Sequence, residues 1–231
     1  MGAKVLTRDF LLKADSKTAF GDIEESLLWS AEQRTASLRD TLARRPDHSP
    51  VWIFGYGSLM WNPIFEADET AVATLQGWHR AFCLHLTAGR GTAHQPGRML
   101  ALQAGGETTG LAFRLPEETL YDELELLWKR EMVTGCYLPT WCELRLQDGR
   151  QVVALAFVMD PEHPQYQPDS CPQTVAPLIA TASGPLGTNA QYLYSLTAEL
   201  QKRGITDEPL IQLAQQVRQL QQSADKTVNE A

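Results

Sequence analysis

The segment with the clearest chemical potential is a glycine-containing loop that follows a short apolar run. Residues 51–54 are typical of a buried strand, and Gly55, Tyr56, Gly57 and Ser58 follow directly. Glycines at alternate positions permit positive φ and leave no Cβ in the way. The backbone N–H groups of such a loop can therefore turn toward one point. The loop is predicted to hold an anion or a developing oxyanion.

A proton-transfer group is predicted at the end of a helix over residues 116–131. At about 100° per residue, Glu131 falls within the apolar stripe of this helix, four residues after Leu127 and three after Trp128. Burial there raises the pKa of a carboxyl group and suits it to general acid/base chemistry. The alternative is that the helix frays and that Glu131 turns to solvent or pairs with Arg130 or Lys129.

Other candidates for chemistry are weaker. Ser58 lacks a G-x-S-x-G elbow and has no His beside it, so it is interpreted as a hydrogen-bonding loop residue rather than a nucleophile. The two loop glycines lack the third glycine of a dinucleotide-binding loop, and no GKS/T follows. His79 and His85 share one face of a predicted strand, but no carboxylate or thiol at matching spacing completes a metal site. We expect no metal and no cofactor.

Composition restricts the class of partner and compartment. The 231 residues carry a formal net charge of −8, which argues against a nucleic-acid surface. The 4 cysteines form no CxxC pair and are expected to be free thiols in a reducing cytoplasm. The first fifteen or so residues do not resemble a signal peptide. No apolar run approaches the roughly 18 residues of a membrane span, so we expect no membrane partner.

The periodicity predicts an α+β fold. Asp148 and Gly149 give a hairpin signal. A Pro-rich loop is expected over 160–172. Residues before 22 are expected to be loosely attached. Strands that hairpins and loops connect suggest a curled mixed or antiparallel sheet, barrel-like, with flanking helices. The expected strands are 51–54, 78–86, 99–102, 110–115, 141–146 and 151–158, and the expected helices are 22–44, 116–131, 189–202 and 208–221.

An ordered set of short motifs resembles the γ-glutamylcyclotransferase superfamily, and within it the ChaC-type, glutathione-specific branch. The set covers most of the chain, and only the glycine loop is specific alone. One departure lies before Arg90, where residues 86–89 (LTAG) lack a Ser and an Asp-His pair that the family often shows. The motifs are Phe54-Gly-Tyr-Gly-Ser-Leu-Met-Trp61, Arg90-Gly-Thr92, Pro96-Gly-Arg98, Gly110-Leu-Ala-Phe113, Arg130-Glu-Met132, Gly135, Tyr137, Ala154-Leu-Ala-Phe157, Gly187-Thr-Asn189 and Tyr192-Leu193.

The resemblance implies that glutathione is split into 5-oxoproline and cysteinylglycine without a cofactor, a metal or water. Glu131 matches the family's essential carboxylate, and Arg90 and Arg98 either meet the glycine carboxylate or brace the loop. The implied substrate-binding residues are Phe54, Gly55, Tyr56, Gly57, Ser58, Leu59, Arg90, Arg98 and Tyr137.

Two other functions stay open at the level of sequence: a cyclotransferase for other γ-glutamyl amino acids or amines, and a non-catalytic regulator of cation transport on the same fold. The predicted organisation is an amino-terminal extension with an amphipathic helix over 1–47, a cyclotransferase-like domain over 48–222 and a disordered tail over 223–231.

Overall fold

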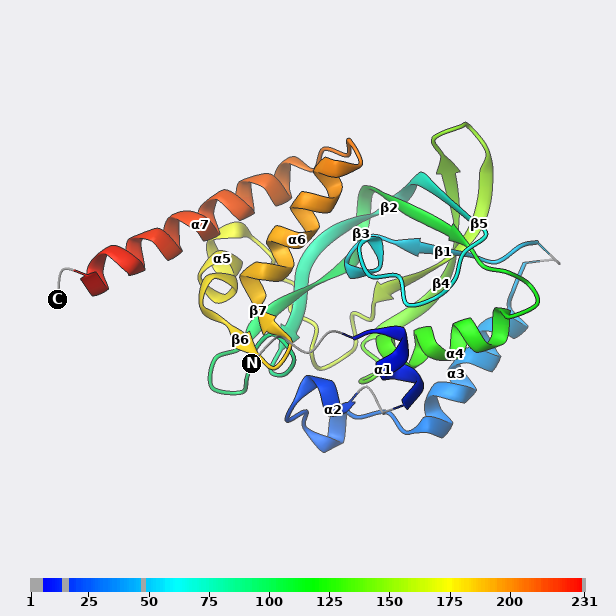
Figure 1. Cartoon of the computed structure of the whole chain (residues 1–231), viewed down its shortest axis with the longest axis horizontal. Helices are drawn as coiled ribbons and strands as arrows, with labels where there is room; N and C mark the ends of the chain where they lie inside the picture. The colour runs from blue at the N-terminus through cyan, green and yellow to red at the C-terminus, as the bar shows by residue number, and fades with distance from the viewer. Residues whose placement is uncertain (1–5, 14–16, 47–48, 230–231) are drawn as a thin grey trace.

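A closed five-stranded barrel forms the centre of the molecule (Figure 1). The computed structural model describes residues 6–13, 17–46 and 49–229. The strand order around the barrel is β1-β3-β2-β4-β5, and β5 closes it by pairing in parallel with β1, while the other neighbours are antiparallel. The predicted α+β class with a curled, barrel-like sheet is confirmed. The strands are β1 (Trp52–Gly55), β2 (Glu69–Leu86), β3 (Gly97–Arg114), β4 (Tyr137–Leu146) and β5 (Gln151–Met159).

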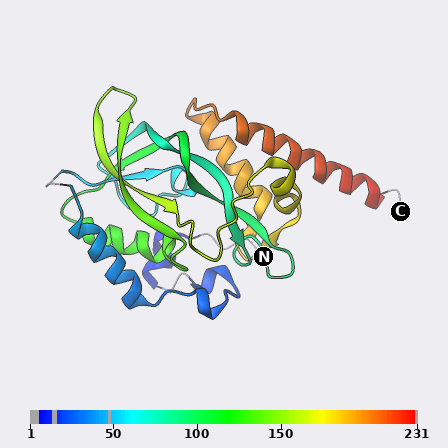
Figure 2. The same cartoon turned by 180° about the vertical axis from the view of Figure 1, so that it is seen from behind.

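Helices cover the barrel in two groups. In Figure 1, α3 (Ala31–Ala43) and α4 (Leu120–Glu131) lie on one side, and α5 (Pro172–Thr181), α6 (Asn189–Lys202) and α7 (Glu208–Asn229) lie on the other. Both Figure 1 and Figure 2 show α7 extending away from the body toward the C-terminus. Short elements complete the fold: α1 (Arg8–Lys13), α2 (Lys17–Phe20), the 3₁₀ turns η1 (Glu25–Leu27) and η2 (Ser58–Met60), and a two-stranded ribbon of β6 (Ser183–Gly184) and β7 (Gly187–Thr188).

The long hairpin of β2 and β3 differs from the prediction. The strands expected at 99–102 and 110–115 are one continuous strand, and β2 begins at Glu69 rather than at 78. Gly77, Gly105 and Gly106 have positive φ and occupy a register irregularity between Gln76 and Trp78. In the sequence these glycines indicate a turn. In the structure they form a bulge inside one hairpin, which bends the strands without ending them.

Helix boundaries were predicted well only where the caps are local. The expected helix 189–202 is confirmed, with a capping box of Thr188 and Gln191 and a positive φ at Gly204. The Asp148-Gly149 turn is likewise confirmed, with Gly149 at φ 90°.

The predicted positions of three other helix ends are wrong. Helix α3 begins at Ala31 rather than at 22, because Ser30 caps it, and α4 begins at Leu120 rather than at 116. Helix α7 continues to Asn229, so most of the expected disordered tail is helical. The sequence analysis also missed α5, which carries prolines at its start and at Pro177. The predicted boundary at 47–48 and residues 230–231 lie outside the described residues.

The amino-terminal segment is attached at several points, which corrects the expectation of loose attachment. The Arg8 guanidinium pairs with Glu123 of α4, whose side chain is 1% exposed. The Asn62 side chain donates to the Leu6 carbonyl at 2.8 Å, and the Gly89 N–H donates to the Phe20 carbonyl at 2.6 Å. The extension thus packs against both helix α4 and the β2–β3 hairpin.

Asn189 connects helix α6 to strand β3. Its side chain is fully buried, accepts from the Arg98 N–H and donates to the Arg98 carbonyl, both at 2.8 Å. A Cβ on Gly97 would lie 2.5 Å from Asn189 Oδ1, so this close approach needs glycine. The contact fixes the start of α6 on the barrel.

Replacing Asn189 with alanine is predicted to lower the free energy of unfolding by about 2–4 kcal/mol, because two buried backbone groups lose their partners. Urea denaturation measures this. The control is Gln191→Ala, which removes an exposed capping contact at the same helix end and should cost about 1 kcal/mol. Equal losses in the two variants would contradict the anchoring role of Asn189.

Candidate active site

A cavity of about 880 Å³ lies where the β1–η2 loop, the end of α4, the start of β4 and helix α6 meet. The loop contributes Tyr56, Gly57, Ser58 and Leu59 to its wall, and strand β1 contributes Phe54. Further lining residues are Trp61, Arg90, Arg130, Glu131, Cys136, Tyr137 and Tyr192. The structure therefore brings the predicted loop and the predicted carboxylate to the same cavity.

Glu131 is the last residue of α4, and its side chain is 17% exposed. Burial raises the pKa of this carboxyl above its ordinary range, and the positive charge of Arg130 opposes the shift in part. The Arg130 Nε lies 3.1 Å from Glu131 Oε1. The helical-wheel argument, which placed Glu131 on the apolar side of its helix, agrees with this position. The alternative, in which Glu131 pairs with Arg130, holds as well, because Glu131 lies on the apolar side of its helix and also contacts Arg130.

Arg130 links the carboxylate to the loop. Its side chain donates to the Ser58 hydroxyl at 2.7 Å and to the Asn62 carbonyl at 2.6 Å, in addition to the contact with Glu131. Ser58 is thus a hydrogen-bonding residue, as its lack of a neighbouring base indicated. Sequence analysis did not single out Arg130 as a site residue, although a buried arginine beside a candidate acid is a usable signal.

Three tyrosines surround the carboxylate. The Tyr56 hydroxyl donates to the Phe157 carbonyl at 2.7 Å, and the Tyr137 hydroxyl lies 3.4 Å from the Leu100 carbonyl. Burial and the charge of Glu131 raise the pKa of Tyr56, and burial raises that of Tyr192 to about 12. These phenols are neutral at physiological pH and add no negative charge beside Glu131. Tyr192 was missed as a site residue in the sequence.

Of the two reasons predicted for the loop glycines, positive φ is wrong, whereas the need for a residue without a Cβ agrees with the structure. Neither Gly55 nor Gly57 is among the positive-φ glycines. Close packing requires them instead: a Cβ on Gly57 would lie 2.6 Å from the Tyr192 hydroxyl, and one on Gly55 would lie 2.9 Å from the Phe113 ring. Gly55 does not line the cavity, although Phe54 beside it in β1 does. The packing of Gly55 against Phe113 accounts for the glycine, and its role as a substrate-binding residue stays a prediction.

The two candidate arginines have different environments. Arg90 lines the cavity, donates to the Thr188 carbonyl at 2.9 Å and places its guanidinium 5.8 Å from the centre of the Tyr192 ring. Arg98 does not line the cavity, although it was predicted to contact substrate. Its side chain is buried, and its Nε and Nη1 have no partner among the described residues. The strand register places it opposite His85, which does not line the cavity either.

Parts of the cavity wall come from segments that were not predicted to take part in the site. Leu6, Phe20 and Ile23 of the amino-terminal extension line it, and so does Gln165 of the Pro-rich loop. The Gln165 carbonyl accepts from the His85 N–H at 2.8 Å, which fixes this loop along β2. No sequence pattern signals these contacts, because they join segments far apart in the chain.

Within residues 6–13, 17–46 and 49–229, no group of three His, Cys, Asp or Glu side chains is arranged to hold a metal ion. His79 instead contacts the Gly105 carbonyl through Nδ1 at 2.9 Å. In the same described ranges, no helix combines the length and the apolarity that crossing a bilayer requires. All four cysteines are free.

The barrel, the glycine loop after β1 and the carboxylate at the end of α4 together define a small α+β enzyme fold of the cyclotransferase type. The family model described as ChaC-like protein matches residues 51–220. The chain belongs to the ChaC-like protein family.

Curated relatives agree with this assignment. The chain is 70% identical over 216 residues to the glutathione-specific γ-glutamylcyclotransferase of Escherichia coli strain K12, covering 94% of each protein. It is 33% identical to glutathione-specific γ-glutamylcyclotransferase 1 of Homo sapiens over 162 residues, which cover 68% of this chain and 73% of that one.

A solved structure confirms the fold. The crystal structure of a glutathione-specific γ-glutamyl cyclotransferase from yeast superposes with a TM-score of 0.69 at 22% identity, covering 74% of this chain and 97% of that one. Since the family match begins at residue 51, the amino-terminal segment that lines the cavity lies outside the family domain.

Gly57→Ala is predicted to lower the free energy of unfolding by about 1–3 kcal/mol, because the new methyl group collides with the Tyr192 hydroxyl. In a Tyr192→Phe background the collision is removed, so the same substitution should cost at least about 0.5 kcal/mol less. Denaturation of the two single variants and the double variant measures this coupling. Strict additivity would show that the hydroxyl does not limit the loop.

Proposed function

We propose that this protein is a glutathione-specific γ-glutamylcyclotransferase that cleaves glutathione to 5-oxoproline and cysteinylglycine. The observation that carries the proposal is the Glu131 carboxyl, with its raised pKa, at the edge of a cavity that the glycine loop also lines. The 70% identity to a named glutathione-specific enzyme over 94% of both chains supports the substrate.

The Glu131 carboxylate takes a proton from the α-ammonium of the γ-glutamyl group. The freed amine attacks the γ-carbonyl carbon, a new C–N bond closes a five-membered ring, and the carbonyl oxygen becomes an oxyanion. Backbone N–H groups of the loop stabilise this charge. As the old C–N bond breaks, protonated Glu131 gives its proton to the amide nitrogen of the cysteinyl residue. The regenerated carboxylate then takes the surplus proton from the ring nitrogen, which becomes the lactam N–H, and passes it to the released amine, which leaves as an ammonium. Atoms balance without water, since the nucleophile belongs to the substrate.

The elevated pKa of Glu131 suits both halves of this cycle. A carboxylate with an ordinary pKa is a poor base toward an ammonium group. Burial raises the pKa of Glu131 and so narrows the gap between the pKa values of the carboxyl and the ammonium group. Nucleophile and electrophile lie in one molecule, so the cavity needs only to hold the γ-glutamyl arm in a folded conformation. This step calls for no cofactor or metal, and we infer none. We also infer that the protein works in the cytoplasm, which its free thiols support.

Substrate contacts follow from the cavity wall. Arg90 is the basic group placed to meet the glycine carboxylate of glutathione, because it lines the cavity where Arg98 does not. Tyr137 and Leu59 line the same cavity near Glu131, which supports their proposed role in binding. A panel of reduced glutathione, γ-glutamyl-alanine and γ-glutamyl amines tests the substrate: comparable turnover of all of them would exclude strict glutathione specificity.

Glu131→Gln is predicted to lower turnover of glutathione by at least about a hundredfold, the scale of a lost general acid/base. A carboxyl with a raised folded-state pKa destabilises the protein as pH rises above its unfolded pKa, because the buried charge has to form. The variant should therefore be at least as stable as the wild type at neutral pH. Mass spectrometry of 5-oxoproline and urea denaturation provide the two readouts, and normal turnover would remove Glu131 from the mechanism.

The pH profile should respond to Arg130. The acid limb of kcat/KM reports the pKa of Glu131 in the free enzyme, and the Arg130 charge lowers that pKa. Arg130→Gln removes the charge, so the limb is predicted to move to higher pH. Arg130→Lys keeps the charge and should leave the limb near its wild-type position. An unmoved limb in Arg130→Gln would indicate that another group sets the acid limb.

A further inference from the structure

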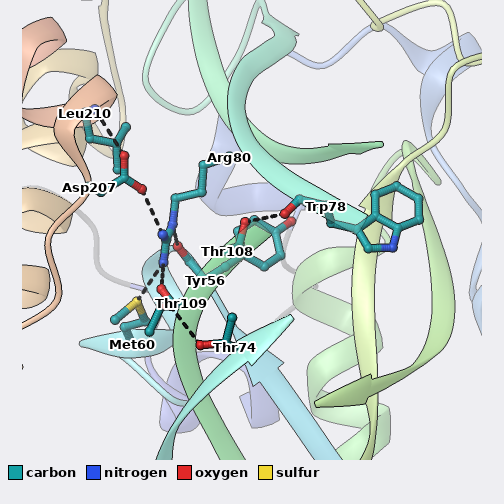
Figure 3. Close-up of polar contacts among 9 residues, drawn as sticks. All are labelled: Tyr56, Met60, Thr74, Trp78, Arg80, Thr108, Thr109, Asp207 and Leu210. Carbon is teal, nitrogen blue, oxygen red and sulfur yellow. Dashed lines mark hydrogen bonds and ion pairs between the residues drawn. The ribbon is translucent and has the colours of Figure 1, made fainter. Parts of the chain in front are cut away.

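A buried arginine lies behind the glycine loop, on the side away from the cavity. Arg80 of β2 has a side chain that is 3% exposed, and it is absent from the cavity wall. Figure 3 shows its guanidinium surrounded by oxygen atoms from three parts of the chain. None of its contacts is with Glu131, so the mechanism described above does not use it.

The contacts of Arg80 converge on the loop. Its Nε donates to the Tyr56 carbonyl at 2.7 Å, and its Nη2 donates to the Thr109 carbonyl at 2.7 Å (Figure 3). Its Nη1 lies 3.0 Å from Asp207 Oδ2. The second oxygen of Asp207 accepts from the Leu210 N–H at the start of α7, at 3.2 Å. A planar guanidinium with a fixed set of donors holds all three oxygens at once, which an ammonium group does not.

The Tyr56 carbonyl fixes the orientation of the next peptide N–H. The peptide between Tyr56 and Gly57 is trans, since the described residues contain no cis bond. In a planar trans peptide the C=O and the following N–H point in opposite directions. Because the Tyr56 carbonyl faces Arg80, the Gly57 N–H faces away from Arg80. Gly57 lines the cavity, and its N–H has no acceptor within the described part of the chain.

We infer that Arg80 is a positioning residue: it holds the Tyr56–Gly57 peptide so that the Gly57 N–H points into the cavity as a donor for the substrate. Asp207 holds the guanidinium in turn and connects the loop to helix α7. This inference rests on the proposed function, because it assigns a role to a donor in that same site. It adds a residue that touches no substrate and acts only through the loop backbone.

One peptide can be observed selectively. Tyr56-Gly57 is the only Tyr-Gly pair in the sequence, so labelling with carbonyl-¹³C tyrosine and ¹⁵N glycine selects its signal alone. In an inactive Glu131→Gln background, reduced glutathione is predicted to shift the Gly57 N–H resonance. Arg80→Lys in this background should change the Tyr56 carbonyl shift before any ligand is added, and should abolish most of the Gly57 response.

Kinetics give the second readout. In the otherwise wild-type chain, Arg80→Lys is predicted to lower kcat/KM by about tenfold or more, since a misdirected donor no longer meets the substrate. The acid limb of the pH profile should stay in place, because Glu131 is not in contact with Arg80. A purely structural role would instead lower the free energy of unfolding while the Gly57 response to glutathione persisted, and that result would overturn the inference.

Asp207→Asn keeps the inference testable if Arg80→Lys does not fold. It retains one of the two acceptor oxygens and removes the negative charge that holds the guanidinium, so the same spectral change is expected with a smaller amplitude. Glu208→Gln is the matched control, because it removes an exposed charge one residue away and should change neither signal. An Asp207→Asn response identical to that of the control would contradict the role of Arg80.

Failure of this inference is distinguishable from failure of the proposed function. If Glu131→Gln abolishes turnover but glutathione leaves the Gly57 resonance unmoved, only the role of Arg80 is wrong. If Glu131→Gln turns over glutathione normally, the proposed mechanism is wrong, whether or not the Gly57 resonance responds to glutathione.

Discussion

The free energy of a buried carboxylate is the constraint around which this site is arranged. Moving a charged group out of water is unfavourable unless opposite charge or hydrogen bonds replace the solvent. At Glu131 a single cation, Arg130, supplies that compensation at 3.1 Å, and the compensation is incomplete because the pKa still rises. Incomplete compensation leaves a carboxyl that can both accept and return a proton. A carboxylate with several cationic neighbours would be stable but a weaker base.

Arginine side chains carry much of the remaining organisation. Arg130 joins the acid to the loop from the helix side, and Arg80 holds the same loop from the barrel side. Each uses several donors of one planar group to bind oxygens from separate segments. The loop between β1 and η2 is therefore held from two directions, which limits the reorganisation that its backbone needs during catalysis. Such fixed dipoles are what the proposed reaction requires, since it needs one oxyanion stabilised and one arm held.

The amino-terminal extension forms part of the cavity wall, although it lies outside the residues that the family model matches. Leu6, Phe20 and Ile23 supply apolar wall, and the Arg8–Glu123 pair holds the segment against helix α4. The Glu123 side chain is 1% exposed, and the Arg8 guanidinium is the cation that contacts it. A segment outside the barrel in this way contributes apolar side chains to the wall of the pocket.

The amino-acid sequence by itself determined the features that local chemistry controls. The cap at Thr188 and the turn at Gly149 follow from residues within a few positions of each other, and the apolar stripe that includes Glu131 follows from helical geometry. Arg80 was not singled out from the sequence, because its partners Tyr56, Thr109 and Asp207 lie elsewhere in the chain.

Only the tertiary structure decided which residues meet. Arg80 reaches Asp207, and Gly57 needs no side chain because Tyr192 occupies the space, yet both pairs are separated by more than a hundred positions. Arg90 lines the cavity and Arg98 does not, although the two lie on the same hairpin. Local rules describe one strand or helix at a time, whereas these contacts arise from the way the barrel, the helices and the amino-terminal segment pack together.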